Sequence, residues 1–341
     1  MREIHVSAIT DAVKKLCMEA NYDLEPDMLR AFDRALKTER SPAGRQVLEI
    51  LKENAQMART QKIPYCQDTG FVVCFVELGQ DVHITGGLLT DAINTGVSQG
   101  YTEGYLRASI VKSPFDRKNT GDNTPAVIHV DLVPGANVKI MLMAKGGGCE
   151  NRSKYKMLTP AAGLDGVKDW ILECIKTAGP DACPPLIAGV GVGGTFEKAA
   201  ILSKKALFRE VGSSNPDPTI DAIEKEVLDK ANRLGIGPQG YGGDTTAFGI
   251  NDTQVELRSK LSFFRCGLVP LYRFLFIFLH ARAFGVDERQ VGHCHNITLF
   301  SRFQCEIKCI FSVQCGIKID LIRRQSNFFS GVPELKLPVG N

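Results

Sequence analysis

The chain has 341 residues, 44% of them hydrophobic and 23% charged, which is the balance of an ordinary globular protein with one large or two ordinary domains. Its net charge of +3 is too small to favour nucleic acid or an anionic membrane surface as a partner. The N-terminus lacks the apolar core of a secretory signal, and Arg273 interrupts the most apolar window, 268–281, so we expect neither export nor a membrane span. Eleven cysteines in such a chain indicate a reducing compartment, here the cytoplasm, with thiols that are buried or metal-bound rather than paired.

Helical spacing of apolar residues dominates the first 60 positions. Residues 7–24 and 26–39 each predict a helix. Ser41 followed by Pro42 predicts the N-cap and first position of a third helix, which continues to residue 60. The N-terminal part is therefore expected to be all helical.

Strands and helices alternate from residue 71 onward. The residues at 126–144 predict a hairpin that turns at 134–137. The other predicted elements are strands at 71–78 and 185–192 and helices at 88–106, 163–178 and 195–208. This mixture predicts an α/β fold of mixed layers rather than a helical bundle or an all-β barrel.

The character of the chain changes near residue 250. Residues 251–341 contain 11 of the 18 Phe and 5 of the 11 Cys, and regular periodicity is hard to find there. We therefore divide the chain into a domain at 1–250 and an atypical, irregular tail at 251–341. The tail offers ligands for zinc, but their spacing fits no common zinc finger. They are His293, Cys294, His295, Cys305, Cys309 and Cys315.

Two short motifs carry side chains suited to a binding site. In "PYCQDTG", Pro64 and Gly70 bracket a turn lined by Cys66, Gln67, Asp68 and Thr69. By composition alone, a turn with a buried cysteine is the more common meaning of such a string. In "AKGGGCENRSKYK", three glycines at 146–148 free backbone N–H groups to face a carboxylate or phosphate, although a flexible exit from a hairpin fits equally well. Cys149, which follows them, is either a ligand or a bystander.

Two further segments are rich in glycine. In "ACPPLIAGVGVGGTFEKAA", Cys183 precedes two stiff prolines, and the glycines of 189–194 weakly suggest a dinucleotide loop whose spacing departs from G-x-G-x-x-G. In "GIGPQGYGGDTTAFG", six glycines between Gly235 and Gly249 allow the backbone to approach a ligand or another chain closely. No Lys-Ser or Lys-Thr pair follows them, so this segment is not a phosphate-binding P-loop.

Together these four segments resemble the class I iron–sulfur hydro-lyases, which comprise oxygen-sensitive fumarate hydratases and L-tartrate dehydratases. The resemblance is to the α-subunit form and runs from about residue 5 to residue 249. It implies a [4Fe–4S] cluster held by three cysteines, two of which match Cys66 and Cys183. Cys149 falls where relatives often have serine and is expected to line the site without holding the cluster. The expected contacts to a dicarboxylate substrate are Gln67, Asp68, Arg107 (in "GYLRASI") and the N–H groups of Gly147 and Gly148.

The implied reaction is the reversible hydration of a small dicarboxylate, fumarate to malate or the dehydration of tartrate. An iron with an open position is a Lewis acid that binds a 2-hydroxy acid. An arginine fork suits the carboxylate. The resemblance places the catalytic base in a separate β subunit, which implies an α2β2-type oligomer. Two alternatives remain open: a catalytically inactive remnant that binds a β-like subunit, and a dinucleotide-binding protein that uses the loop Gly189 to Gly194.

The third cluster cysteine of the family has no clear counterpart. An ungapped match would place it near Pro270, and Cys266 is the nearest candidate, without the His and Arg expected after it. We therefore expect that 251–341 is not the C-terminal end of the family sequence but the product of a frameshift, a retained intron or an incorrect gene prediction. Such a chain would be left with two ligands and would be inactive.

Overall fold

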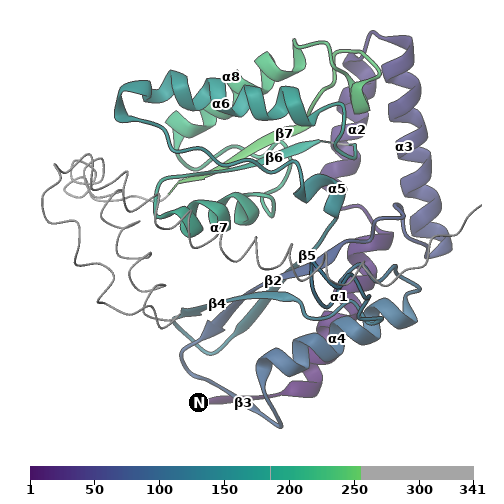
Figure 1. Ribbon diagram of the computed structural model, residues 1–341, viewed down its shortest axis with the longest axis vertical. Helices are drawn as coiled ribbons and strands as arrows, with labels where there is room; N and C mark the ends of the chain where they lie inside the picture. The colour runs from purple at the N-terminus through teal and green to yellow at the C-terminus, as the bar shows by residue number, and fades with distance from the viewer. Residues whose placement is uncertain (185, 255–341) are drawn as a thin grey trace, which may run out of the picture. The chain divides into compact units, whose positions relative to one another are not determined.

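The structure is a computed structural model that describes residues 1–184 and 186–254 (Figure 1). The predicted α/β class is confirmed over this range. Cys266, the six candidate zinc ligands and the predicted irregular tail beyond residue 254 lie outside the described residues. Within the described range, no helix has the length and apolar character needed to cross a membrane.

Three helices begin the domain after the short strand β1 (Arg2–His5). They are α1 (Val6–Tyr22), α2 (Pro26–Thr38) and α3 (Pro42–Gln61), each within three residues of its prediction. The predicted cap of α3 is confirmed, because the Ser41 hydroxyl accepts a hydrogen bond of 3.2 Å from the Gly44 N–H group.

The central sheet differs from its prediction in one respect. Strands β4 (Val127–Val133) and β5 (Val138–Lys145) do not form the predicted hairpin, because β2 (Phe71–Gly79) lies between them (Figure 1). β2 is parallel to β4 and antiparallel to β5. Gly79 makes this insertion possible, since a Cβ atom there would lie 2.4 Å from the Gly135 carbonyl oxygen in the connecting turn. A continuous buried run at 72–76 in β2 fits a strand with neighbours on both sides.

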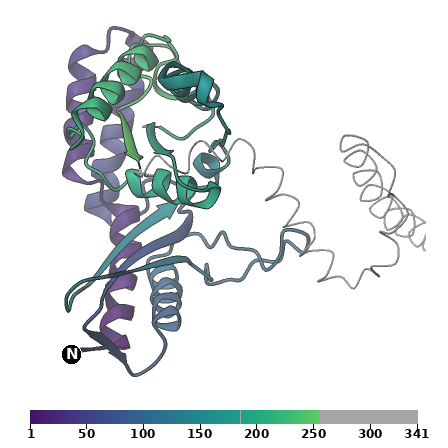
Figure 2. The ribbon, with the colours of Figure 1, turned by 90° about the vertical axis from the view of Figure 1, so that its left-hand side faces the viewer.

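Helices α1 and α4 (Leu89–Glu103) pack against this sheet on one face (Figure 2). Two glycines let the helices approach each other closely. A Cβ atom on Gly96 would lie 2.6 Å from the Thr10 carbonyl oxygen, and one on Gly100 would lie 2.9 Å from the Cys17 Cβ atom. The core between these layers is mainly apolar and includes Val13, Cys17, Val72, Cys74, Val76, Ile93 and Val97. The small parallel pair of β1 and β3 (Val82–Thr85) lies outside the central sheet.

The second half of the domain is a smaller α/β layer. Parallel strands β6 (Ile187–Val192) and β7 (Gly249–Gln254) lie between α7 (Phe196–Ala206) on one face and α6 (Gly163–Ala178) with α8 (Pro218–Asn232) on the other (Figure 1). Cβ atoms on Gly189 and Gly191 would lie 2.2 Å from carbonyl oxygens of α7. Close packing of strand on helix therefore accounts for these two glycines without a nucleotide.

Strand β7 also crosses the expected boundary at residue 250. It pairs with β6 in register as far as Gln254, opposite Val192. Regular structure therefore extends a few residues into the segment assigned to the tail.

The Glu39 carboxylate joins the N-terminal helices to the loop before β7. This side chain is 5% exposed and accepts hydrogen bonds from the backbone N–H groups of Ser41 (2.9 Å), Asp244 (2.9 and 3.0 Å) and Thr245 (2.8 Å). Arg40 adds an ion pair of 2.8 Å with the Asp244 carboxylate. Burial raises the pKa of Glu39, but the hydrogen bonds from Asp244, Ser41 and Thr245 outweigh it and lower the pKa overall.

We expect Glu39→Gln to lower the free energy of unfolding by about 1–3 kcal/mol, because the amide nitrogen cannot accept the bonds that a carboxylate oxygen accepts. Because its folded pKa is lowered, Glu39 stabilises the fold above its unfolded pKa of about 4.3, and this contribution is lost as the pH falls through the folded pKa. Urea unfolding at neutral and acidic pH should therefore show that the difference in free energy of unfolding between the wild type and Glu39→Gln becomes smaller in acid. Exposed Glu49→Gln is the matched control, and equal effects of the two changes would contradict the assignment.

Candidate functional site: three thiols around a glycine loop

Three segments that are distant in sequence meet at one place in the domain. They are the turn at 64–70, the glycine loop at 146–149 and the segment at 181–184. The Asp68 N–H group donates to the Cys66 sulfur at 3.4 Å, and the Asp68 Oδ2 atom accepts a hydrogen bond of 3.2 Å from the Gly148 N–H group. A Cβ atom on Gly148 would in turn lie 3.7 Å from the Cys183 sulfur. Cys183 thus lies against the glycine loop, and Cys66 lies next to Asp68, which the same loop contacts.

Cys149 belongs to the same group of thiols. Its thiol and that of Cys66 both interact electrostatically with the thiol of Cys183. Partial burial of the sulfur, followed by the neighbouring Cys149 and Cys66 thiols and Asp68, raises the pKa of Cys183 to about 11. Sequence reasoning treated Cys149 as a residue that only lines the site. The signal that could have indicated more was its position directly after the three glycines.

The turn that carries Cys66 is held against the sheet by a close backbone approach. Gly70 has a φ of +69°, and a Cβ atom there would lie 2.5 Å from the Lys145 carbonyl carbon. The Tyr101 hydroxyl donates a hydrogen bond of 2.6 Å to the Thr69 carbonyl, and the Asn123 amide donates one of 3.1 Å to the Gly70 carbonyl. The Tyr101 and Asn123 side chains are both buried, so they fix the turn from the protein interior.

The same turn places Arg107. The Thr69 hydroxyl donates a hydrogen bond of 2.9 Å to the Arg107 carbonyl, which ties the segment after α4 to the cysteine turn. Asn123 supports this segment from its other side by accepting from the N–H groups of Ser109 and Ile110. Arg107 itself is exposed.

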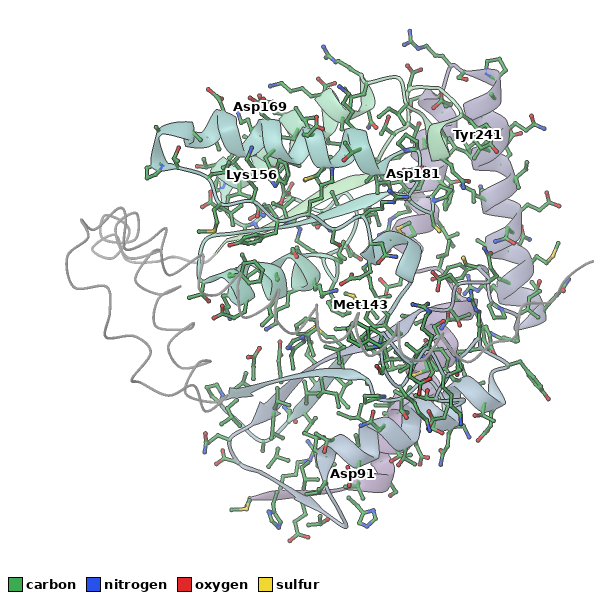
Figure 3. All side chains as sticks on the ribbon, in the orientation of Figure 1. Asp91, Met143, Lys156, Asp169, Asp181 and Tyr241 are labelled. Atoms are coloured by element: carbon green, nitrogen blue, oxygen red, sulfur yellow. The ribbon has the colours of Figure 1, made fainter. Side chains whose placement is uncertain are left out.

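Ion pairs hold the glycine loop from below. The loop forms the single turn α5 (Gly147–Glu150), and its Glu150 carboxylate pairs with Lys204 at 2.6 Å and Lys145 at 3.3 Å. Burial raises the pKa of Glu150, but the bonds from Lys204 and Lys145 outweigh it and lower the pKa. Arg152 continues the chain and pairs at 3.1 Å with Asp181, which is labelled in Figure 3. These contacts connect the loop to the Cys183 segment.

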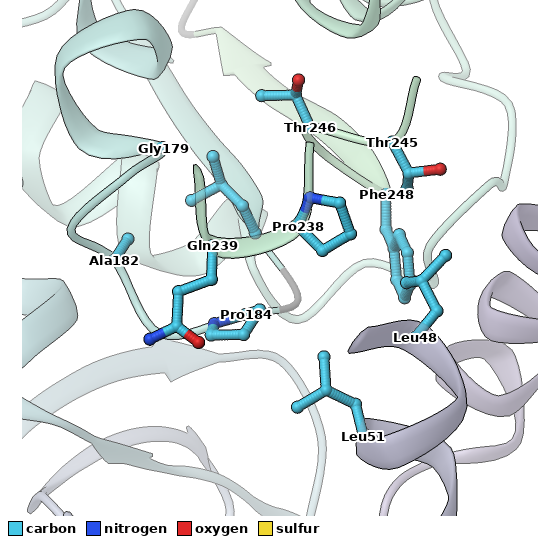
Figure 4. Close-up of a pocket in the computed structure, with 11 residues that line it drawn as sticks. Leu48, Leu51, Gly179, Ala182, Pro184, Pro238, Gln239, Thr245, Thr246 and Phe248 are labelled. Carbon is cyan, nitrogen blue, oxygen red and sulfur yellow. The ribbon is translucent and has the colours of Figure 1, made fainter. Parts of the chain in front are cut away.

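Close packing fixes the segment that carries Cys183. Pro184 lies near Leu48 and Leu51 of α3 and near Phe248, around a cavity of about 10 Å³ (Figure 4). That space is roughly enough for one water molecule, so it is a packing feature and not a ligand pocket. Cys183 therefore projects from a stiff, well-supported backbone.

The remaining predicted contacts have specific surroundings. Gln67 is exposed, and its amide oxygen lies 3.8 Å from the Cys66 sulfur. The two carboxylate oxygens of Asp68 accept hydrogen bonds from the backbone N–H groups of Gly70 and Gly148. The Gly148 N–H group, which was expected to face the substrate, therefore has Asp68 as its acceptor. Gly147 begins the same turn of helix.

The donor set suits iron and sulfur better than a single hard cation. In the described part of the chain, no group of three or more His, Cys, Asp or Glu side chains stands ready to hold a metal ion. Thiolates are the ligands of iron–sulfur clusters. The described thiols near the glycine loop are those of Cys66, Cys149 and Cys183.

Fold and site together define an α/β protein with a thiol-lined site built on a glycine loop. Comparison with known proteins agrees with this class. A family model described as fumarate hydratase (Fumerase) matches residues 10–258. The chain therefore belongs to the fumarate hydratase family, a family of hydro-lyases.

Several relatives of this chain are named as alpha subunits of L(+)-tartrate dehydratase. A protein of Methanocaldococcus jannaschii named "Putative L(+)-tartrate dehydratase subunit alpha" is 38% identical over 248 residues, which are 71% of this chain and 87% of the relative. The L(+)-tartrate dehydratase subunit alpha of Escherichia coli K12 is 32% identical over 250 residues, 72% of this chain and 82% of the relative. The corresponding protein of Shigella sonnei shows the same values.

We expect Gly70→Ala to destabilise the domain well beyond the cost of its backbone angle. Gly235 has a φ of +68° with nothing within 4 Å of a Cβ atom, so Gly235→Ala should cost only about 1–2 kcal/mol. Gly70→Ala should add roughly 1–3 kcal/mol for the collision with Lys145. Urea unfolding of the two variants measures the difference, and equal costs would show that the close approach does not hold the cysteine turn.

Proposed function

We propose that this chain is the α subunit of an iron–sulfur-dependent hydro-lyase that hydrates or dehydrates a small dicarboxylate. The observation that carries the proposal is the convergence of Cys66 and Cys183 on the Asp68–Gly148 contact in a chain of the fumarate hydratase family. The ligands would be these two thiols of a [4Fe–4S] cluster. When bound, the cluster would supply a Lewis acid for the hydroxyl and carboxylate of a 2-hydroxy acid.

The protein's own groups would bind and orient the substrate. Arg107 is exposed beside the cysteine turn, where its guanidinium fork would bind a carboxylate through two parallel hydrogen bonds. Gln67 would add an amide to the same rim, and the N–H group of Gly147 would face the anion. Asp68 and Gly148, which hydrogen-bond each other, would hold the floor of the site in shape.

The substrate class follows from the relatives' names and from the donors. Fumarate, malate and tartrate each carry two carboxylates, and malate and tartrate have a hydroxyl next to a carboxylate. Relatives named for L(+)-tartrate favour that member of the class, whereas the family model is named for fumarate. Both substrates belong in the first assay.

A partner subunit would complete the site. The relatives are named as alpha subunits, which supports a β subunit as partner of this chain in an α2β2-type assembly. We expect that subunit to supply the catalytic base. We propose a reducing compartment such as the cytoplasm, because a chain with eleven cysteines keeps thiols available for a cluster there.

The end of the family match at residue 258 favours a second candidate function, a remnant that captures a β-like subunit without a cluster. In this alternative the chain beyond the match would derive from a frameshift or an incorrect gene prediction. Such a remnant would be colourless after anaerobic iron and sulfide treatment and would still bind the β subunit. The dinucleotide alternative loses support, because Gly189 and Gly191 are needed for packing against α7.

We expect the full chain, supplied with iron and sulfide without oxygen, to become brown, and Cys66→Ser to lose most of that colour. A serine hydroxyl is a harder and less acidic ligand than a thiol, and iron–sulfur clusters are held by thiolates. Cys174→Ser is the matched control, because Cys174 lies on α6 and is half-buried like Cys66. A variant at Cys66 that keeps the full visible spectrum would remove this residue from the ligand set.

We expect Arg107→Lys to raise KM for the dicarboxylate by about tenfold or more, since lysine keeps the charge but loses the two-pronged hydrogen bond. The loaded chain is combined with a β subunit of the same family and assayed with fumarate, L-malate and L-tartrate. Arg117→Lys, at an exposed arginine of the same segment, should leave KM unchanged. Equal KM values for the two variants would argue that Arg107 does not meet the substrate.

A further inference from the structure

We propose that two copies of this chain pair along strand β4, antiparallel and edge to edge, and so join their central sheets into one. The inference rests on the proposed function in one respect, the two α subunits of an α2β2-type assembly, and it names the surface on which these subunits meet. It also gives a role to exposed apolar side chains of β4 that neither the fold nor the candidate site explains.

Strand β4 is the last strand on one side of the central sheet. The strand order is β4-β2-β5, and in the described part of the chain no strand pairs with the outer edge of β4 (Figure 1). The strand is seven residues long and contains no proline and no lysine. Natural edge strands avoid pairing with other chains by such residues, by bulges or by being short. A long apolar edge without these features can accept a further strand.

The hydrogen bonds to β2 show which backbone groups of β4 face outward. The Gln80 N–H group donates a hydrogen bond of 2.8 Å to the Val133 carbonyl, so the polar backbone groups of Val133 face β2. These groups alternate in direction along a strand, so those of Ile128, Val130 and Leu132 face the outer edge. An antiparallel strand of the same sequence would bond to these three residues.

The sequence of β4 selects one register for such a pair. With the two-fold axis at Val130, the middle of the strand, all seven residues of each copy are paired. The three outward residues would then exchange about six hydrogen bonds with the second copy. In this register His129 lies opposite Asp131 of the second copy. The neighbouring registers place the axis at His129 or Asp131, which sets like side chains opposite each other and shortens the paired length. The strand is therefore self-complementary, as a two-fold contact requires.

This pairing would cover apolar side chains that are exposed in the single chain. Ile128 packs against the core formed with α1 and α4. Val130 and Leu132 lie on the same face of the strand, but they are 45% and 70% exposed. Across the axis Val130 would meet its own copy, and Leu132 would meet Ile128 of the second copy. Removal of apolar surface from water is the main driving force of most protein association.

The opposite face of β4 carries the polar pair. His129 stacks on Phe75 with ring centroids 4.8 Å apart, which holds the imidazole on this face. Asp131 pairs with Lys205 of α7, and the Asp131 side chain is still 51% exposed. Its carboxylate can therefore bind Lys205 and also accept a hydrogen bond from His129 of the second copy. Opposite-charge and polar pairs of this kind stabilise neighbouring antiparallel strands.

The test is sedimentation velocity of the full-length chain alone, in reducing buffer and across micromolar concentrations. The wild type should sediment as a dimer. Val130→Pro should raise the dissociation constant at least about tenfold, because proline removes an outward N–H group and leaves the bonds to β2 intact. Leu132→Lys should have an effect of the same direction, since a charge would face Ile128 of the second copy. Leu164→Lys, at an exposed leucine of α6, is the matched control and should sediment as the wild type does.

A cross-link tests the register. Val130→Cys would place the two introduced thiols opposite each other, with Cα atoms about 5.5 Å apart, which a disulfide can span. Leu132→Cys would leave its two introduced thiols roughly 13 Å apart along the strands. After mild oxidation with diamide, Val130→Cys should give more covalent dimer than Leu132→Cys and the wild type. Equal amounts from the two variants would exclude this register.

The outcomes separate this proposal from the proposed function. A monomeric wild type overturns the β4 contact, and so does a dimer that Val130→Pro and Leu132→Lys leave unchanged. If these changes prevent binding of a β subunit and not of a second copy, the edge belongs to that subunit and the proposal is wrong. Circular dichroism checks folding, and if Val130→Pro does not fold, Leu132→Lys and the cross-link decide. Anaerobic uptake of iron and sulfide is measured on the same samples: a dimer without uptake overturns the proposed function alone, and a monomer with uptake overturns the β4 contact alone.

Discussion

The Asp68 carboxylate is the contact on which the candidate site depends. Its two oxygens accept from Gly70 within its own turn and from Gly148 across 80 residues of sequence. A carboxylate that accepts backbone N–H groups on both oxygens is held in one orientation. The turn with Cys66 and the loop with Cys149 are thereby joined through one side chain, and Cys183 lies against the second of them. The close approach of Gly70 to Lys145 and the ion pair of Arg152 with Asp181 add to this link.

Small residues are the means by which the fold brings these segments so close. Gly70 admits the Lys145 carbonyl, Gly79 admits the turn between β4 and β5, and Gly96 admits α1. In each case a side chain would collide with backbone, which cannot rotate away as a long side chain can. The glycine content that first suggested ligand loops is thus partly structural. Around the site the glycines allow close backbone packing, and this packing leaves the thiols on the surface of a rigid frame.

Local patterns predicted the helices well, because capping and apolar spacing act over a few residues. Ser41 and Pro42 located the start of α3, and α6 occupies the predicted range. The hairpin at 126–144 was wrong because two adjacent strands joined by a short turn usually pair, and only the tertiary contact of Gly79 with the turn shows that β2 separates them. For the site, family motifs singled out Cys66, Asp68 and Cys183. The position of Cys149 after three glycines indicates a loop, but nothing local to residue 149 encodes its neighbour in the segment before β6.

The contacts of Glu39 have a consequence for how the protein is made. This carboxylate closes on Asp244 and Thr245, more than 200 residues later in the chain. At roughly 5–20 residues per second, a nascent chain displays Cys66 for several seconds before Cys183 has been synthesised, and longer before the Glu39 contact can form. Contacts between such distant residues also tend to form slowly. Biogenesis therefore includes an interval in which the Cys66 thiol has been made and its final neighbours have not, so the site is assembled only late in synthesis.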